Sequence, residues 1–325
     1  MAVPSSGQLG LYSSIGTELG VSQSNVSLRG MSSTAGFSTP DAMSEFYGYS
    51  SGVTVDFWMA AGGGGGGSDN NWGTRGGGGG GGGAVRTSGV ISGTVIITVG
   101  GGGSVLPSTN GGNSSISGTY TCFGGGAGGG FNDSTRNGGS GGSGGGNVAG
   151  YSAVGTAVAN QGTVGGSAFG SFGGAGGGGG GVLGATTPAA SPIFNPEPVM
   201  GGNGGLFNFY PWYIMQIFGV GERIGNDFYC SGGGSSRSSE QNGYYDNTVG
   251  GLGGGGDWQG ATPLANTGGG GGGGGGAYGR TGGSGFVVLE IPEAVYSGVY
   301  TGAASATNTL GKWFLVYKSS GTYTV

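Results

Sequence analysis

The chain has 325 residues, of which 95 are glycine and none is histidine, and its net charge is −5 with only nine basic residues. Nucleic-acid binding relies on Lys and Arg to neutralise phosphates, so the shortage of basic residues argues against it. The absence of histidine removes the commonest general base and metal ligand, and we expect no catalytic residue, metal site or cofactor.

The first fifty residues carry spaced apolar side chains in place of glycine runs. Thr39 followed by Pro40 predicts the start of a helix, and Gly48 predicts its end. Residues 1–50 are too few for a core of their own, which favours a segment that attaches the chain to a larger assembly. An arm that packs on the rest of the chain is the alternative. The candidate attachment residues are Leu11, Ile15, Leu19, Leu28, Met43 and Phe46.

The glycines stand in pure runs, the longest at 62–67, 76–83, 176–181 and 268–276. Such runs are either flexible linkers or an ordered bundle. Ordering the backbone costs about 1–2 kcal/mol per residue, and each hydrogen bond returns about 0.5–1.5 kcal/mol. A lone run therefore cannot order itself, whereas a bundle in which each run pairs with several neighbours can. An aromatic content of 10% and a charged content of 7% favour order.

An ordered glycine run has one obvious form, the extended helix with three residues per turn that is geometrically like polyproline II. Runs of β-branched and apolar residues at 53–59, 94–99 and 286–291 predict β-strands that frame the glycine region. The predicted fold is mostly irregular and β. It consists of a bundle of polyglycine II helices over residues 51–292, framed by short strands.

The most apolar stretch, 206–218, is too short to span a bilayer, so we expect no membrane insertion. Its rings suit a binding surface, because Tyr and Trp offer large rigid contact areas with polar tips. The alternative is that they cap the open end of the glycine bundle. The candidate binding residues here and in later loops are Phe209, Tyr210, Trp212, Tyr213, Tyr244, Tyr245 and Trp258.

The sequence offers few residues for metal binding or catalysis. The two cysteines, Cys122 and Cys230, cannot build a thiolate zinc site by themselves. We predict free buried thiols, with a disulfide as the alternative. Two carboxylates can hydrolyse a glycosidic bond, but nothing in the spacing of the loop acids favours such a pair. Those loop acids are Glu222, Asp227, Asp246 and Asp257.

The end of the chain, residues 293–325, is predicted to hold a β-hairpin. Its strands are 312–317 and 322–325, joined by a turn through Ser319, Ser320 and Gly321. A two-stranded hairpin is marginal alone, so we expect it to pair with the strands at 53–59 and 286–291.

One ordered set of motifs resembles a known family. The strand 55–61 leads into the glycines 62–67, and the pattern continues through 94–100 and 110–116 to 282–289. This set resembles the glycine-rich domain of phage tail-fibre proteins, including the tail-tip adhesins of T-even-like phages. The resemblance covers residues 53–292 and implies a sandwich of polyglycine helices with receptor-binding loops at one end. The insertion at 206–218 and the Pro-rich stretch 186–198 lie outside the common core.

The first fifty residues are likewise similar to the N-terminal segment that joins many phage tail proteins to the particle. We therefore expect a non-catalytic structural protein of a phage tail, in the fibre or tip, that binds a protein or glycan of the host surface. Its partners would be other tail proteins, and self-association is possible. Residues 1–5 show no secretory signal, which fits synthesis in the host cytoplasm. A glycan-degrading tailspike and a secreted glycine-rich structural protein are the alternatives.

Overall fold

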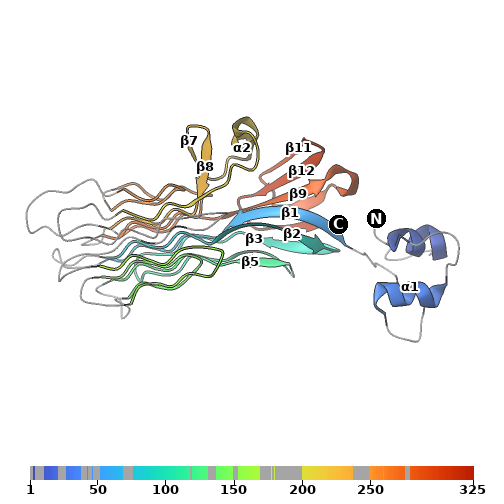
Figure 1. Cartoon of the computed structure of the whole chain (residues 1–325), viewed down its shortest axis with the longest axis horizontal. Helices are drawn as coiled ribbons and strands as arrows, with labels where there is room; N and C mark the ends of the chain where they lie inside the picture. The colour runs from blue at the N-terminus through green and yellow to red at the C-terminus, as the bar shows by residue number, and fades with distance from the viewer. Residues whose placement is uncertain are drawn as a thin grey trace, which may run out of the picture.

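The computed structural model describes residues 3, 11–20, 27–37, 42, 46, 52–68, 76–117, 119–130, 137–148, 153–168, 177, 179, 200–236, 249–258, 260–274 and 279–325. Over these residues the chain is mostly β, with few helices. The body is elongated, with the larger strands in one half and the glycine runs continuing them into the other (Figure 1).

The strands form two five-stranded antiparallel sheets and one small sheet. The first sheet has the order β11-β12-β9-β1-β2, the second β10-β13-β3-β4-β5, and the small sheet β6-β8-β7. The strands are β1 (Val53–Ala60), β2 (Ala84–Ile91), β3 (Thr94–Thr98), β4 (Ser114–Ile116), β5 (Tyr120–Cys122), β6 (Gly205–Leu206), β7 (Glu222–Ile224), β8 (Asp227–Cys230), β9 (Phe286–Pro292), β10 (Val299–Thr301), β11 (Ser305–Thr309), β12 (Lys312–Tyr317) and β13 (Gly321–Thr324).

The central strands of the first sheet are buried on both faces. Alternate residues of β1, such as Val55 and Phe57, pack against the second sheet in one core. Trp58, which points the other way, belongs to a second core with the helix α2 (Trp212–Phe218) and the small sheet. Because β1, β9 and β12 carry apolar side chains on both faces, these strands take the middle of the sheet. The predicted strands at 53–59, 94–99 and 286–291 are confirmed as β1, β3 and β9.

The run 61–67, which consists of Ala61 and six glycines, continues β1 and is hydrogen-bonded on all sides. Its amides donate in rotation to three segments, 109–112, 280–283 and 77–80, so every third residue returns to the same neighbour. The pairs are Gly62–Gly112, Gly63–Gly283, Gly64–Gly80, Gly65–Thr109, Gly66–Arg280 and Gly67–Gly77, at 2.8 to 3.0 Å. Its carbonyls accept from three further segments, at Gly103, 125–128 and 271–274. The run 76–83, which leads into β2, is bonded in the same way to its own neighbours.

Missing side chains make this packing possible. A Cβ added to Gly66 would lie 2.1 Å from the carbonyl oxygen of Gly272. Ordinary contacts between such atoms are longer than 3 Å, so a larger residue does not fit without moving backbone. The glycine content of the described runs therefore serves close approach of one backbone to the next.

The predicted C-terminal hairpin is wrong, although its two strands exist. β12 pairs with β11 and β9 in the first sheet, whereas β13 pairs with β10 and β3 in the second. Residues 318–320 thus carry the chain from one sheet to the other, and Tyr317 donates a hydrogen bond to the carbonyl of Thr322 across this corner. The hairpin in this region is β11–β12, which turns at Leu310 and Gly311, both with positive φ. Pairing of the segment 312–317 with 286–291 is as expected.

The N-terminal residues form a separate small cluster beyond the sheets (Figure 1). It contains the π-helix η1 (Leu11–Gly16) and α1 (Leu28–Ala35). Ser27 caps α1 by accepting a hydrogen bond from Gly30 N at 3.1 Å, and Gly36 ends the helix in the left-handed conformation. Most of the helix predicted from Thr39 to Gly48 lies outside the described residues. A 3₁₀ turn, η3 (Glu293–Val295), follows β9.

Candidate binding surface

The aromatic stretch of the sequence forms the helix α2, which starts after Pro211 and ends at Gly219. Ile214, Met215 and Phe218 point into the protein and are buried. The other side of the helix faces solvent, where Trp212 is 42% exposed, Tyr213 57% and Ile217 51%. Two of the predicted binding residues, Trp212 and Tyr213, therefore lie on an exposed face, and Ile217 joins them.

A cluster of rings holds α2 against the first sheet. Trp58 of β1 lies at its centre, with ring centroids of Phe207, Phe209, Phe218 and Phe286 between 5.4 and 5.9 Å away. All four pairs have tilted or edge-to-face geometry, and aromatic rings favour edge-to-face contacts. Phe209, a predicted binding residue, is thus partly buried against the core that supports the exposed surface.

A buried carboxylate lies beside this ring cluster. Glu290 of β9 is fully buried, and its oxygens accept from Arg86 Nη2 at 3.3 Å, Lys312 Nζ at 3.2 Å and the hydroxyl of Tyr210 at 2.5 Å. Burial, reinforced by the hydrogen bond and charge of Glu290, raises the pKa of Tyr210 to about 12. Tyr210, another predicted binding residue, therefore has its polar end turned inward.

Lys312 also contacts a second carboxylate. Its Nζ lies 3.0 Å from Asp56 Oδ2, and Ser88 Oγ donates to Asp56 Oδ1 at 2.6 Å. The hydrogen bond from Ser88, assisted by Lys312, holds the pKa of Asp56 below its ordinary value despite partial burial. Burial lowers the pKa of Lys312, but its bond to Asp56 and the charge of Glu290 raise it overall. Two carboxylates and two cations, including Arg86, thus balance in charge.

The exposed face of α2 carries a fixed cation. The guanidinium of Arg223, from β7, lies 4.8 Å from the ring centroid of Trp212. Its Nη1 donates to Gln216 Oε1 at 2.8 Å and its Nε to the carbonyl of Gly225 at 2.7 Å. A cation stacked on a partly exposed Trp gives this surface both apolar area and a positive charge. We call Trp212, Tyr213, Ile217 and Arg223 the α2 surface.

The described loop acids each accept hydrogen bonds from nearby groups of the chain. Glu222 Oε2 accepts from the backbone amides of Gly253 and Gly254 at 2.7 and 2.9 Å. Asp227 Oδ1 accepts from Asn208 Nδ2, and Asp257 Oδ1 from two backbone amides of its own turn. Asp246 lies outside the described residues.

The remaining predicted residues are placed as follows. Trp258 is half-buried, and Tyr244 and Tyr245 lie outside the described residues. Of the attachment residues, Ile15 and Phe46 are buried together with Val3 and Met31, and Leu19 and Leu28 pack partly against them. The backbone of Leu11 lies in η1, and Met43 is outside the described residues.

Cys122 and Cys230 are free and buried, as predicted. They belong to different cores, Cys122 to the one between the two large sheets and Cys230 to the one beneath α2. Among the described residues, no three His, Cys, Asp or Glu side chains gather as a metal site would require. In the same part of the chain, no helix has the length and apolar character needed to cross a membrane.

Sequence reasoning missed Arg223, Ile217 and the ionic cluster. A signal existed for the cluster, because Glu290 is a single acid inside the apolar run 286–291, and such a residue needs a partner. Its partners are far away in the chain and have no signature of their own.

Comparison with known proteins gives one match. A family model described as a glycine-rich domain matches residues 42–292, which is most of the chain. No curated protein and no solved structure matches the chain.

Proposed function

Because the chain belongs to the glycine-rich domain family, we propose that it is a structural protein of a phage tail, located in the fibre or the tip. It binds a protein or glycan of the host surface without catalysis, and other tail proteins are its partners. In this proposal the chain is made in the host cytoplasm and becomes part of the virion. Self-association through its exposed surfaces is compatible with this arrangement.

In this proposal the glycine runs form a bundle of polyglycine II helices. The supporting observation is the rotation of hydrogen-bond partners along the run 61–67, in which residues three apart share a neighbour. A helix with three residues per turn directs successive amides to three sides and produces this pattern. Such a bundle is a rigid support. Its own surface gives little means of distinguishing one binding partner from another, because its backbone is the same everywhere.

The observation that carries the binding proposal is the α2 surface. Trp212, Tyr213 and Ile217 are exposed while the helix beneath them is fixed by the ring cluster around Trp58 and by the bond from Tyr210 to Glu290. Aromatic residues and Arg dominate the energetic centres of interfaces, and binding residues gather on elements held by a rigid scaffold. A fixed surface also loses little conformational freedom on binding.

The N-terminal cluster supports an attachment role. Ile15, Met31 and Phe46 form its interior, and it stands apart from the sheets at the end opposite the glycine runs (Figure 1). In this proposal these side chains keep the unit folded, and its outer face joins the particle. The alternative of a glycan-degrading tailspike is not favoured, because Glu222, Asp227 and Asp257 are each engaged in local hydrogen bonds.

The test is adsorption of virions to host cells. Virions carrying Trp212→Ala with Tyr213→Ala should assemble normally and contain the chain, as judged by mass spectrometry. Truncating a ring at the centre of an interface costs about 2 kcal/mol, or roughly thirtyfold in affinity, so adsorption should slow strongly. Val90→Ala, which alters an exposed side chain on β2, is the matched control.

Two results would overturn different parts of this proposal. Normal adsorption of the double variant would remove the α2 surface as the receptor site. Absence of the chain from purified virions would contradict the proposal that it is a structural protein of the virion.

A further inference from the structure

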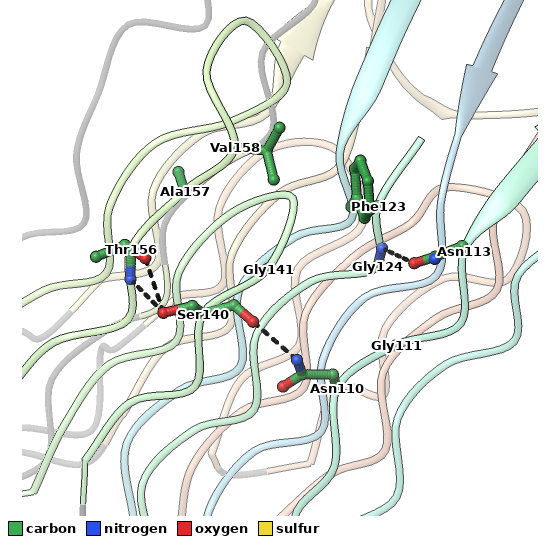
Figure 2. A pocket seen from close by; sticks show the side chains of 10 residues that line it. All are labelled: Asn110, Gly111, Asn113, Phe123, Gly124, Ser140, Gly141, Thr156, Ala157 and Val158. Carbon is green, nitrogen blue, oxygen red and sulfur yellow. Dashed lines mark hydrogen bonds between the residues drawn. The ribbon is translucent and has the colours of Figure 1, made fainter. Parts of the chain in front are cut away.

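A separate pocket lies where the chain enters β4 and leaves β5 (Figure 2). Residues of β4 and β5 pack in the core between the two large sheets, on the other side of the first sheet from α2. The volume of the pocket is about 270 Å³. Asn110, Asn113, Phe123, Ser140, Thr156 and Val158 line it, together with glycines of the runs between them. No charged side chain belongs to the described lining.

Phe123 is an exposed ring on a fixed backbone. Its ring is 42% exposed, while its amide donates to Gln161 Oε1 at 2.9 Å and its carbonyl accepts from Gly83 at 2.8 Å. Gln161 is itself buried and donates from Nε2 to the carbonyl of Thr121. The chain thus presents an aromatic face to solvent at a position that the bundle holds rigidly.

The amides of the pocket are oriented by backbone groups. Asn110 accepts from Ala127 N and donates to the carbonyl of Ser140, both at 2.8 Å. Asn113 Oδ1 accepts from Gly124 N at 2.9 Å, which turns the side chain so that its Nδ2 is the free end (Figure 2). Within the described part of the chain, Nδ2 of Asn113 has no hydrogen-bond partner.

The hydroxyl of Ser140 is oriented as a donor. Its Oγ accepts from Thr156 N at 3.1 Å and from Thr156 Oγ1 at 2.8 Å (Figure 2). With both acceptor positions used, its own hydrogen remains for a further partner. The pocket therefore combines an apolar ring with outward-directed donors, and its described lining carries no charged side chain.

We propose that this pocket binds a neutral sugar unit of a glycan. The C–H face of a pyranose ring packs on Phe123, and the hydroxyl and ring oxygens accept from Asn113 Nδ2 and Ser140 Oγ. A few oriented polar groups around an apolar surface are what small-ligand sites use to fix orientation. The described lining contains neither Lys nor Arg, which does not favour an anionic ligand. This site is independent of the α2 surface and does not rest on the assignment to a phage tail.

The test is saturation-transfer NMR on the full chain, with glucose, galactose, mannose and N-acetylglucosamine as probes. At least one sugar should receive saturation at its C–H protons. Phe123→Ala should weaken that binding about tenfold, which corresponds to about 1.4 kcal/mol, because it removes the ring against which the sugar packs. Phe123→Tyr keeps the ring and should keep binding.

A second variant separates recognition from folding. Asn113→Asp keeps the oxygen that accepts from Gly124 N but removes the Nδ2 donor, so it should also weaken binding while leaving the melting temperature close to wild type. Ile96→Ala, at an exposed position of β3 outside the pocket, is the control that should bind as wild type does. Absence of transfer to all four sugars, or transfer unchanged by both Phe123→Ala and Asn113→Asp, would overturn the proposal.

Discussion

The hydroxyl of Tyr210 donates to Glu290 Oε2 at 2.5 Å, joining residues 80 positions apart in the chain. This bond fastens Tyr210, two residues before α2, to the buried centre of the first sheet. The support of the exposed α2 surface is therefore anchored by an ionic cluster as well as by rings.

Replacing Tyr210 by Phe should destabilise the protein measurably. A hydrogen bond to a charged group contributes about 1.5–3 kcal/mol, and the buried Glu290 would lose one of its three donors. Urea denaturation followed by fluorescence would measure the change. Tyr213→Phe removes a hydroxyl from an exposed ring and serves as the control. Equal denaturation midpoints for the two variants would show that the bond contributes nothing.

Glycine-to-alanine substitutions should separate sharply by position. In Gly66→Ala the new Cβ would meet a carbonyl oxygen at 2.1 Å, so the free energy of unfolding should fall by at least about 3 kcal/mol. In Gly101→Ala the Cβ would meet nothing within 4 Å, so stability should be unchanged or slightly higher. Thermal melts of both variants test this, and similar melting temperatures would argue against a packed glycine interior.

Backbone amides of the glycine runs should exchange slowly with solvent. The runs 61–67 and 76–83 are bonded to several neighbours each, so opening one amide requires separating more than one pair of segments. Hydrogen exchange read by mass spectrometry should show protection in these runs comparable to that in β1 and β9. Full exchange within seconds would contradict the proposed polyglycine bundle.

The stability contributed by Asp56 should depend on pH in a defined direction. Its pKa in the folded protein is lowered by the hydrogen bond from Ser88 and by Lys312, below the ordinary value of 3.8. The contribution is therefore present above the unfolded pKa and is lost as the pH falls through the folded pKa. Asp56→Asn should be less stable than wild type near about pH 7, and the difference should shrink towards about pH 2. Melting temperatures across this range check the sign, and a constant difference would refute it.

The two cysteines should be inert in the folded protein. Burial raises the pKa of Cys230 to about 12 and also raises that of Cys122, so little thiolate forms at neutral pH. A chromogenic disulfide reagent should react with neither thiol until denaturant is added, and with both afterwards. Reaction of one equivalent under native conditions would place a thiol at the surface.

The framing strands were predictable because their apolar runs end at Gly or Pro, as at Gly100 after the run 94–99 and Pro292 after the run 286–291. The separation of β12 and β13 into different sheets was not predictable, because a Ser-Ser-Gly turn fits a hairpin and a crossing between sheets equally well. The hydrogen-bond partners of each glycine run could not be predicted either, because identical runs have identical pairing chemistry. The α2 surface was anticipated through Trp212 and Tyr213, whereas Arg223 enters it from another element.

The rotation of hydrogen-bond partners has a consequence for how the chain finds its alignment. Sliding one glycine run by three residues past its neighbours would recreate the same set of bonds, so the runs cannot choose their own register. The register of the runs is therefore set by the β-strands that continue them. β1 fixes the run 61–67 through side chains such as Phe57 and Trp58, and β2 and β9 do the same for the runs that precede them. The two large β-sheets thus act as the template that sets the alignment of the glycine runs.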